Sequence, residues 1–326
     1  MAFTVDATAF RFPDTFAAGV RGKRVLITGA GKDGGLGQAF ALAAGLNGAS
    51  HVGVHFHTSY DDGLDLVKQL GSQGVNAFPV QADVTNLGDL WSTRSYVIER
   101  FGGKTPDVLV CNSGLSEKGY LFGRALREIE GESRAMRRAR VRQAFMTNLE
   151  ESKAVLDTKI DGFLAMTHLW AGEAVHADAP LRIVYVSSRQ AIDPGPGVPG
   201  YVVANWGVLQ LPKVLALNLG KSAPLVSASA VLFPFVRTGM TGEYADNPKI
   251  FGRWQPRMLE TPEAARAFLQ LLGRPADETA GQLYELMADK DDARGEGAVR
   301  VGWKSVKLSA EESALPWSEA EPLRFP

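Results

Sequence analysis

The chain of 326 residues has a single cysteine, Cys111, and this scarcity excludes two kinds of structure. One thiol cannot form an intramolecular disulfide, and it cannot build a cysteine-rich zinc site. Lack of disulfides is typical of proteins that are kept in a reducing compartment. We therefore expect a cytoplasmic protein.

An excess of one charge and a long apolar run are also missing. Lys and Arg total 35 and Asp and Glu total 36, so the chain has no basic field to hold nucleic acid or an anionic membrane. No apolar stretch approaches the roughly 20 residues that span a bilayer, and the first twenty residues lack the pattern of a signal peptide. We expect a soluble protein that binds a small molecule, and neither nucleic acid nor membrane.

A glycine-rich segment follows the first apolar run. Residues 23–28 have the pattern of a buried strand, and Gly-Ala-Gly-Lys-Asp-Gly-Gly-Leu-Gly and an alanine-rich helix to about Leu46 come next. Strand, glycine loop and helix are the context of a dinucleotide fingerprint, in which the backbone approaches a pyrophosphate at a helix N-terminus. The residues that we expect to bind the cofactor here are Gly29, Lys32, Gly35, Leu36 and Gly37.

Short apolar runs then alternate with helical patterns along most of the chain. The expected strands are 51–55, 75–81, 107–112, 182–187, 225–232 and 281–287, and the expected helices are 61–73, 86–101, 142–175 with a break near 150, 201–220 and 261–272. This alternation predicts an α/β fold, a doubly wound parallel sheet of the Rossmann type in a single domain. We expect an N-terminal lead over 1–22, the domain over 23–287 and a C-terminal extension over 288–326.

The end of the second strand indicates which nicotinamide cofactor is bound. An NAD site usually has an acidic residue there, whereas this chain has His57, Thr58 and Ser59, and Lys32 stands in the glycine loop. Hydroxyls and a lysine suit a 2′-phosphate, so the sequence favours NADPH. His51, His55 and His57 have no acidic or thiol ligand beside them, and we expect no metal site.

A charged helical insertion, 115–143, follows the fourth strand. Between 116 and 143 it has eight basic and four acidic residues, a difference of plus four. Such a segment could dock an acidic carrier protein or a coenzyme A phosphate, but a solvated helical face is the simpler interpretation. The four acidic residues are Glu117, Glu128, Glu130 and Glu132.

The sequence also predicts the positions of two segments after the sixth strand. Residues 238–250 follow the sixth strand, where open α/β sheets bind ligands, and they could form a lid over the substrate. The polar tail contains Trp303 and Trp317, and we expect it to pack back on the domain or on a neighbouring subunit.

The stretch from Ser188 to Asn205 is the candidate catalytic segment. It places a hydroxyl at Ser188, at a strand end, and a phenol at Tyr201, at the start of a helix and 13 positions later. The two groups can converge on one carbonyl. Asn205 lies one helical turn beyond Tyr201, on the same face of the helix.

Taken together, these residues resemble those of the short-chain dehydrogenase/reductases, over roughly Arg21 to Leu286. The resemblance rests on Thr28-Gly29 with the glycine loop, Asp83-Val84, Asn112-Ser113-Gly114, Ser188 with Tyr201, and Pro234 to Thr238. It implies cofactor contacts from Asp83, Val84, Asn112, Gly114, Pro234 and Thr238. It also implies a homo-oligomer, a dimer or tetramer, formed through the two long helices around strand five.

The chain departs from the commonest pattern of that family. The glycine loop is longer by two residues, Ser113 and Phe235 replace small residues, and the lysine expected four residues after Tyr201 is Asn205. The position that usually carries asparagine is Lys159. This exchange resembles the ketoreductase domains of modular polyketide synthases, and a reciprocal exchange implies a working enzyme with Tyr201, Ser188, Lys159 and Asn205 as its catalytic residues.

Those residues suit carbonyl reduction. Tyr201 would be the general acid, and Ser188 would donate to the developing alkoxide. A free tyrosine titrates near 10, so its use near neutrality requires roughly 3 to 4 kcal/mol in favour of the phenolate. A lysine ammonium about 4 Å away supplies about 4 kcal/mol at an effective dielectric near 20. We expect Lys159 to supply this charge and Asn205 to hold a water or orient Lys159.

The leading hypothesis is an NADPH-dependent ketoreductase for a small-molecule ketone. The ketone is either free or attached to a carrier protein or to coenzyme A. Enoyl-thioester reductases of the same superfamily resemble one another in a lysine seven residues after the tyrosine, and here that position is Val208. A different class is a non-redox scaffold that keeps the nucleotide fold for binding, regulation or cyclisation. Asn205 and Phe235 are the features that support it.

Overall fold

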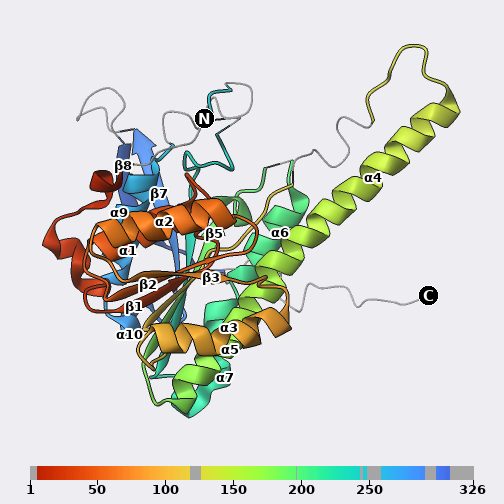
Figure 1. Ribbon diagram of the computed structural model, residues 1–326. Coiled ribbons are helices and arrows are strands. Elements are labelled where there is room, and N and C mark those ends of the chain that lie inside the picture. The colour runs from red at the N-terminus through yellow and green to blue at the C-terminus, as the bar shows by residue number, and fades with distance from the viewer. Residues whose placement is uncertain are drawn as a thin grey trace, which may run out of the picture.

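The computed structural model describes residues 6–117, 126–195, 197–242, 245–247, 258–290 and 299–308. Eight strands form one sheet in the order β3-β2-β1-β4-β5-β6-β7-β8, with β1 to β7 parallel and β8 antiparallel to β7 (Figure 1). Their bounds are Arg24–Ile27, His51–Phe56, Ala77–Gln81, Val108–Cys111, Leu181–Ser188, Val226–Phe233, Leu283–Lys290 and Val299–Ser305. The predicted α/β fold of the Rossmann type is confirmed.

Helices cover both faces of the sheet, and an apolar core lies on each side. β5 supplies both cores in alternation, since Ile183 and Tyr185 lie in one and Val184 and Val186 in the other. The helices are α1 Leu36–Leu46, α2 Tyr60–Ser72, α3 Leu87–Arg100, α4 Arg134–Leu156, α5 Gly162–His176, α6 Pro199–Val208, α7 Leu211–Leu219, α9 Thr261–Leu272 and α10 Ala276–Thr279. α1 and α9 cover one face, and α3 and α5 the other.

The helical region before β5 differs from the prediction in where it starts and in where it is irregular. α4 begins at Arg134, because the Ser133 hydroxyl accepts a hydrogen bond from the Met136 amide and caps it. It runs through the expected break near Glu150 and projects beyond the body of the molecule (Figure 1). The irregular point is a π-helical turn, Asp157–Asp161, which joins α4 to α5 and carries Lys159. Turns of this kind are frequent at functional sites.

The helix expected over 201–220 is instead two helices. α6 ends at Val208, and α7 starts at Leu211 with Pro212 in its first turn. Proline has no amide hydrogen to donate and is suited to a helix start, so the break falls in front of it.

The chain beyond the expected last strand joins the sheet. β7 continues to Lys290, and β8 pairs with it as an antiparallel edge strand. Trp303 on β8 packs on the core with its ring centroid 6.4 Å from that of Phe233, as the prediction for the tail requires. Trp317 lies outside the described residues.

The region of α6 and α7, Pro199–Ser222, is long and apolar enough to cross a membrane by length and composition alone. This is weak evidence for a span, since core helices of soluble proteins pass the same test. In the structure α6 packs against β5 and α4.

Candidate active site

The carboxyl ends of β1, β4, β5 and β6 meet along one edge of the sheet. β1 and β4 are neighbours in the sheet. The chain continues from β1 to β2 on one side of this pair and from β4 to β5 on the other, so the strand order reverses between them. Open α/β sheets bind ligands at such a switch point. The Thr28 hydroxyl accepts the amides of Asn112 and Ser113 at 2.9 and 3.0 Å. The Asn112 amide nitrogen donates to the carbonyl oxygens of Thr28 and Gly29. Asn112 therefore fastens the glycine loop to the end of β4.

Two glycines of this loop have no room for a side chain. Gly29 has a φ of +63°, and a Cβ there would lie 2.8 Å from the Cα of Ser113. A Cβ on Gly37 would lie 2.3 Å from the carbonyl oxygen of Gly29. Gly35 is the N-cap of α1, which starts at Leu36 and has no side-chain cap. The first turn of α1 thus presents backbone donors to an anion, as a pyrophosphate site requires.

Gln38 is a part of this loop that sequence reasoning missed. Its amide oxygen accepts the Gly34 amide at 2.8 Å, and its amide nitrogen donates to the Asp33 carboxylate at 2.9 Å. The side chain is buried and reaches back one turn over the added residues of the longer loop. A polar residue inside an otherwise apolar helix was the available signal.

Lys32 lies close to the segment that joins β2 to α2. A Cβ on Gly31 would lie 3.0 Å from the Ser59 carbonyl oxygen, so the loop passes directly over the start of α2. The Lys32 ammonium is 3.7 Å from the carboxylate of Asp62 on α2. Ser59 directly precedes α2, and the neighbouring Thr58 is mostly solvent-accessible.

His57 faces the end of β3. Its ring nitrogen lies 3.8 Å from the Asp83 carboxylate. Burial works to raise the pKa of Asp83, but hydrogen bonds from Thr85 outweigh it and hold that pKa below its usual value. His55 is buried, which lowers its pKa to about 4, and its ring accepts the Gly29 amide at 3.4 Å. The structure thus gives His55 a packing contact, and groups of three metal-binding side chains are absent from the described residues.

Of the two predicted cofactor contacts Val84 and Thr238, the first is packed in the core and the second lies near the glycine loop. Val84 is buried against Gly162 at the start of α5, so it packs two elements together. The segment after β6 folds over the glycine loop, because the Gly239 amide donates to the Gly34 carbonyl oxygen at 3.2 Å. Thr238 therefore lies beside the expected pyrophosphate site. Of the proposed lid, 243–244 and 248–250 lie outside the described residues.

Ser188 and Tyr201 come together as predicted. Ser188 is the last residue of β5 and Tyr201 lies in the first turn of α6. The Ser188 side chain lies near the Tyr201 phenol. Burial raises the pKa of the phenol, and the nearby Ser188 hydroxyl acts in the opposite direction. The phenol is therefore protonated at neutral pH, as a proton donor must be.

Lys159 is buried on the π-helical turn, with 5% of its surface exposed. Its ammonium lies 4.9 Å from the centre of the Phe163 ring, and a Cβ on Gly114 would lie 3.5 Å from it. Burial lowers the pKa of Lys159 to about 7, although the nearby Cys111 thiol acts in the opposite direction. The lysine thus lies beside the Asn112–Gly114 turn and changes its charge near neutral pH.

Asn205 is fully buried on α6, one turn beyond Tyr201. Its amide nitrogen donates to the Tyr201 carbonyl oxygen at 2.9 Å, and its backbone oxygen accepts the Ser187 hydroxyl. Its side-chain oxygen has no hydrogen-bond partner within the described part of the chain. An orphaned buried acceptor costs free energy unless a donor reaches it.

Glu117 is the second functional candidate that the sequence did not reveal. It is a buried carboxylate that accepts hydrogen bonds from the amides of Gly200 and Tyr201 and from the Ser152 hydroxyl. These partners lie on α4 and α6, 35 to 84 residues away along the chain. No local pattern marks such a contact.

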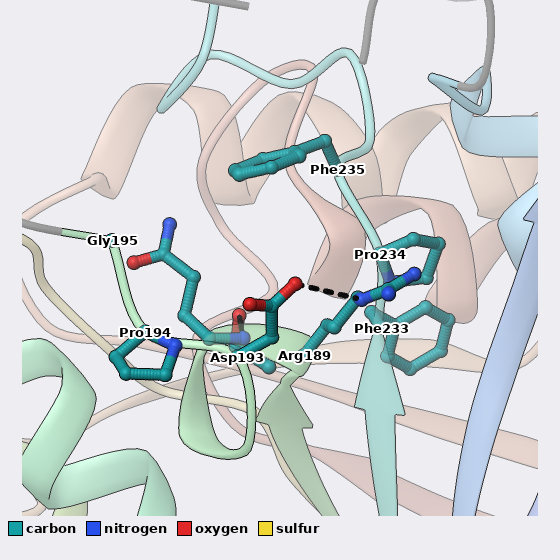
Figure 2. Close-up of a pocket in the computed structure, with 9 residues that line it drawn as sticks. Arg189, Asp193, Pro194, Gly195, Phe233, Pro234 and Phe235 are labelled. Atoms are coloured by element: carbon teal, nitrogen blue, oxygen red, sulfur yellow. Dashed lines mark hydrogen bonds and ion pairs between the residues drawn. The ribbon is translucent and has the colours of Figure 1, made fainter. Parts of the chain in front are cut away.

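A pocket opens beside Ser188 (Figure 2). The ring of Phe235 lies across it from Arg189 and Asp193, whose ion pair spans 3.6 Å. The side-chain oxygen of Gln190 is buried without a partner in the described structure. The residues that line the pocket are Ser188, Arg189, Gln190, Asp193, Pro194, Gly195, Phe233, Pro234 and Phe235.

Ser188 lines the pocket, so its hydroxyl can donate a hydrogen bond to a carbonyl group held there. Tyr201 lies near Ser188 but is not one of the lining residues, and a nucleotide cradle lies at the adjoining strand ends. A glycine cradle and a helix start without a side-chain cap fit the pyrophosphate of a dinucleotide.

Comparisons with known proteins agree with this geometry. The chain is 25% identical over 227 residues to the 3-oxoacyl-[acyl-carrier-protein] reductase FabG of Staphylococcus epidermidis, which covers 70% of this chain and 80% of the relative. It is 25% identical over 255 residues to the uncharacterized oxidoreductase YohF of Escherichia coli, with 77% and 89% covered.

Solved structures share the fold. A short chain dehydrogenase from Burkholderia cenocepacia in complex with NADP has a TM-score of 0.64 at 20% identity, over 86% of this chain and 99% of that one. A putative gluconate dehydrogenase from Agrobacterium tumefaciens has a TM-score of 0.65 at 20% identity, with 82% and 94% covered. The family model for short chain dehydrogenases matches residues 23–249, well over half of the chain. The protein therefore belongs to the short chain dehydrogenase family.

Proposed function

We propose that the protein is an NADPH-dependent ketoreductase. The observation that carries this proposal is the position of Ser188, which ends β5, lines a pocket and lies near the buried Tyr201 phenol at the start of α6, next to a nucleotide cradle. Membership of an oxidoreductase family supports the reaction class. The names of the relatives support a ketone as the group that is reduced.

Tyr201 gives its phenolic proton to the carbonyl oxygen, and Ser188 hydrogen-bonds the same oxygen. A bound NADPH would supply the hydride to the carbonyl carbon. Protonation by Tyr201 and stabilisation by Ser188 lower the barrier because negative charge develops on the oxygen in the transition state. The position of Ser188 suits this role, since it lines the pocket and lies near the phenol.

Lys159 supplies the positive charge that favours loss of the proton from Tyr201. The ammonium lies beside Gly114, and the π-helical turn that carries it packs against α6, the helix of Tyr201. The orphaned oxygen of Asn205 offers an acceptor for this ammonium or for a water molecule. Asn205 thus completes the exchange with Lys159, as a neutral residue that orients the charge.

NADPH fits the cradle better than NADH. Gly29, Gly35, Leu36 and Gly37 would hold the pyrophosphate, and Lys32 with Thr58 and Ser59 would meet the 2′-phosphate. The Lys32 ammonium in the glycine loop is exposed. The segment His57-Thr58-Ser59, which follows β2, contains no acidic residue. The remaining residues that we expect to bind the cofactor are Asp83, Val84, Asn112, Gly114, Pro234 and Thr238.

The substrate class is an oxo-acyl group, carried as a thioester. The first relatives act on 3-oxoacyl groups attached to an acyl carrier protein, as their names state. The protein would work in the cytoplasm as a homo-oligomer. A non-redox scaffold is the competing proposal, supported by Phe235 and by Asn205 in place of lysine.

Absorbance of NADPH, followed with a panel of ketones and oxo-thioesters, separates these two proposals. A ketoreductase consumes NADPH with at least one oxo substrate, and NADH serves it less well. Tight NADPH binding without turnover on the whole panel would favour the scaffold.

Tyr201→Phe is the matched variant, because it removes only the phenolic oxygen. We expect the rate of ketone reduction to fall by roughly 10²- to 10⁴-fold, the usual contribution of a general acid. The dissociation constant for NADPH, measured by fluorescence, should stay within about twofold. Full turnover in this variant would exclude Tyr201 as the proton donor.

A further inference from the structure

We propose that Glu117 is a positioning residue, which fixes Tyr201 by clamping the first turn of α6 onto α4. This inference rests on the proposed ketoreductase function for the importance of Tyr201. Its structural basis is independent of that function. Glu117 is not one of the residues that line the pocket, and its bonds to α6 go to backbone amides of the helix.

The first turn of α6 lacks a cap of its own. Its N-cap is Val198, which has no polar side chain, and Pro199 follows as the first helical residue. The amides of Gly200 and Tyr201 are therefore left without a local acceptor. Both donate to the Glu117 carboxylate, Gly200 to one oxygen and Tyr201 to the other at 3.1 Å. A carboxylate at this point also faces the positive end of the helix dipole.

The same carboxylate is held from the other side by α4. The Ser152 hydroxyl donates to it at 3.0 Å. Gly200 permits this approach, because a Cβ there would lie 2.6 Å from the carboxylate oxygen and 2.8 Å from the Cα of Ser152. Glu117, Ser152 and Gly200 thus form one clamp between two helices.

The clamp connects the two groups on which the proposed chemistry depends. α4 continues from Ser152 into the turn that carries Lys159, and α6 begins with Tyr201. Glu117 itself follows the Asn112–Gly114 turn, which lies beside the Lys159 ammonium. Because the carboxylate is buried, loss of it leaves two buried donors unpaired and frees the turn that holds the phenol.

Glu117→Ala tests the clamp, and Glu128→Gln is the control in the same charged segment. Glu128 is an exposed partner of Arg137 on the projecting arm. Glu117→Ala should lower kcat on the order of 10²-fold, the effect of a misplaced catalytic group, with NADPH affinity kept. Glu117→Gln keeps an oxygen for Gly200 and Ser152 and should recover part of the rate. Glu128→Gln should match the wild type.

Two readouts do not depend on turnover. In Glu117→Ala, amide hydrogen exchange over residues 197–205 should rise at least tenfold. The pKa of the phenol should also change, because its burial and the nearby Ser188 hydroxyl both set that pKa in the wild type. This pKa is read from the difference between the ultraviolet titrations of each variant and its Tyr201→Phe partner. Unchanged exchange or an unchanged phenol titration would overturn the positioning role.

The proposed function can fail separately from this inference. A wild type that reduces no ketone would refute the ketoreductase, and exchange and titration would still decide on the clamp. An active wild type whose Glu117→Ala variant keeps full kcat and the same pH profile would overturn the inference alone. A fall in melting temperature with kcat unchanged would likewise assign Glu117 a merely structural role.

Discussion

At the scale of single residues, burial sets the protonation of the groups on which the site depends. It raises the pKa of the Tyr201 phenol and lowers that of the Lys159 ammonium to about 7. Both shifts favour the neutral forms, which suits a donor that must keep its proton until the carbonyl arrives. With a pKa of about 7, Lys159 is partly charged near neutral pH and loses its charge as the pH rises further.

Lys159→Met should raise stability at low pH and lower activity. The pKa of Lys159 in the folded state lies below its unfolded value near 10.4, so the folded chain binds fewer protons between pH 7 and pH 10. The cost of burying the charge is therefore complete below pH 7 and fades as the pH rises toward 10. Each pKa unit corresponds to about 1.4 kcal/mol. Thermal unfolding should show a clearly larger gain at pH 6 than at pH 9.5.

The same variant tests the catalytic role of the charge. Without the ammonium the phenol holds its proton more strongly, so the rate of reduction should fall and its pH optimum should move upward. Lys153→Met on the last turn of α4 is the control, because that lysine is exposed. An unchanged pH profile in Lys159→Met would argue against the lysine as the partner of Tyr201.

At the scale of elements, the contact between α1 and the sheet decides whether a dinucleotide can bind. A Cβ on Gly37 would collide with Gly29 and Asn112, so a side chain there forces the helix away from the strand ends. The cradle of backbone donors would then open. This close approach is the part of the fingerprint that only glycine permits.

Gly37→Val should therefore abolish NADPH binding, with the dissociation constant raised at least 100-fold by fluorescence titration. Gly71→Ala on α2 is the matched control, since a Cβ there meets open space. It should leave the dissociation constant unchanged and stabilise the chain by roughly 0.5 to 1 kcal/mol. Wild-type affinity in Gly37→Val would refute the cradle.

The elements also show how far sequence patterns reach. The parallel strands and the glycine loop were predictable, because alternating apolar runs and glycines at fixed spacing reflect local physics. The start of α4 at Arg134 was visible in Ser133, and the break before α7 in Pro212, although charge and apolar content obscured both. Glu117 was not predictable, since its partners lie on other elements and its segment reads as a solvated face.

At the scale of the whole molecule, apolar surface remains exposed on the side of α6 and α7. Trp206 is 50% exposed and Leu217 is 74% exposed, and Val203 lies one turn before Trp206. Trp206 is therefore not part of the core. A half-exposed tryptophan beside other apolar side chains is typical of an interface anchor.

Trp206→Ala should lower the molar mass in solution, measured by light scattering during size-exclusion chromatography. The wild type should elute as a dimer or tetramer, and the variant should shift toward the monomer with its circular dichroism unchanged. Trp91→Ala on α3 is the control, because it removes a tryptophan that is even more exposed, at 67%, on a different helix. A monomeric wild type would contradict the expected oligomer.

The account as a whole depends on the charge that Lys159 brings to Tyr201. A crystal structure with NADPH bound measures this directly, as the distance from the Lys159 Nζ atom to the Tyr201 phenolic oxygen. We expect about 4 to 6 Å, the range in which one charge shifts the pKa of a neighbouring group, with the Asn205 oxygen bonded to the ammonium or to a shared water. A separation of about 10 Å or more, a Debye length in ordinary buffer, would contradict the exchange of roles between Lys159 and Asn205.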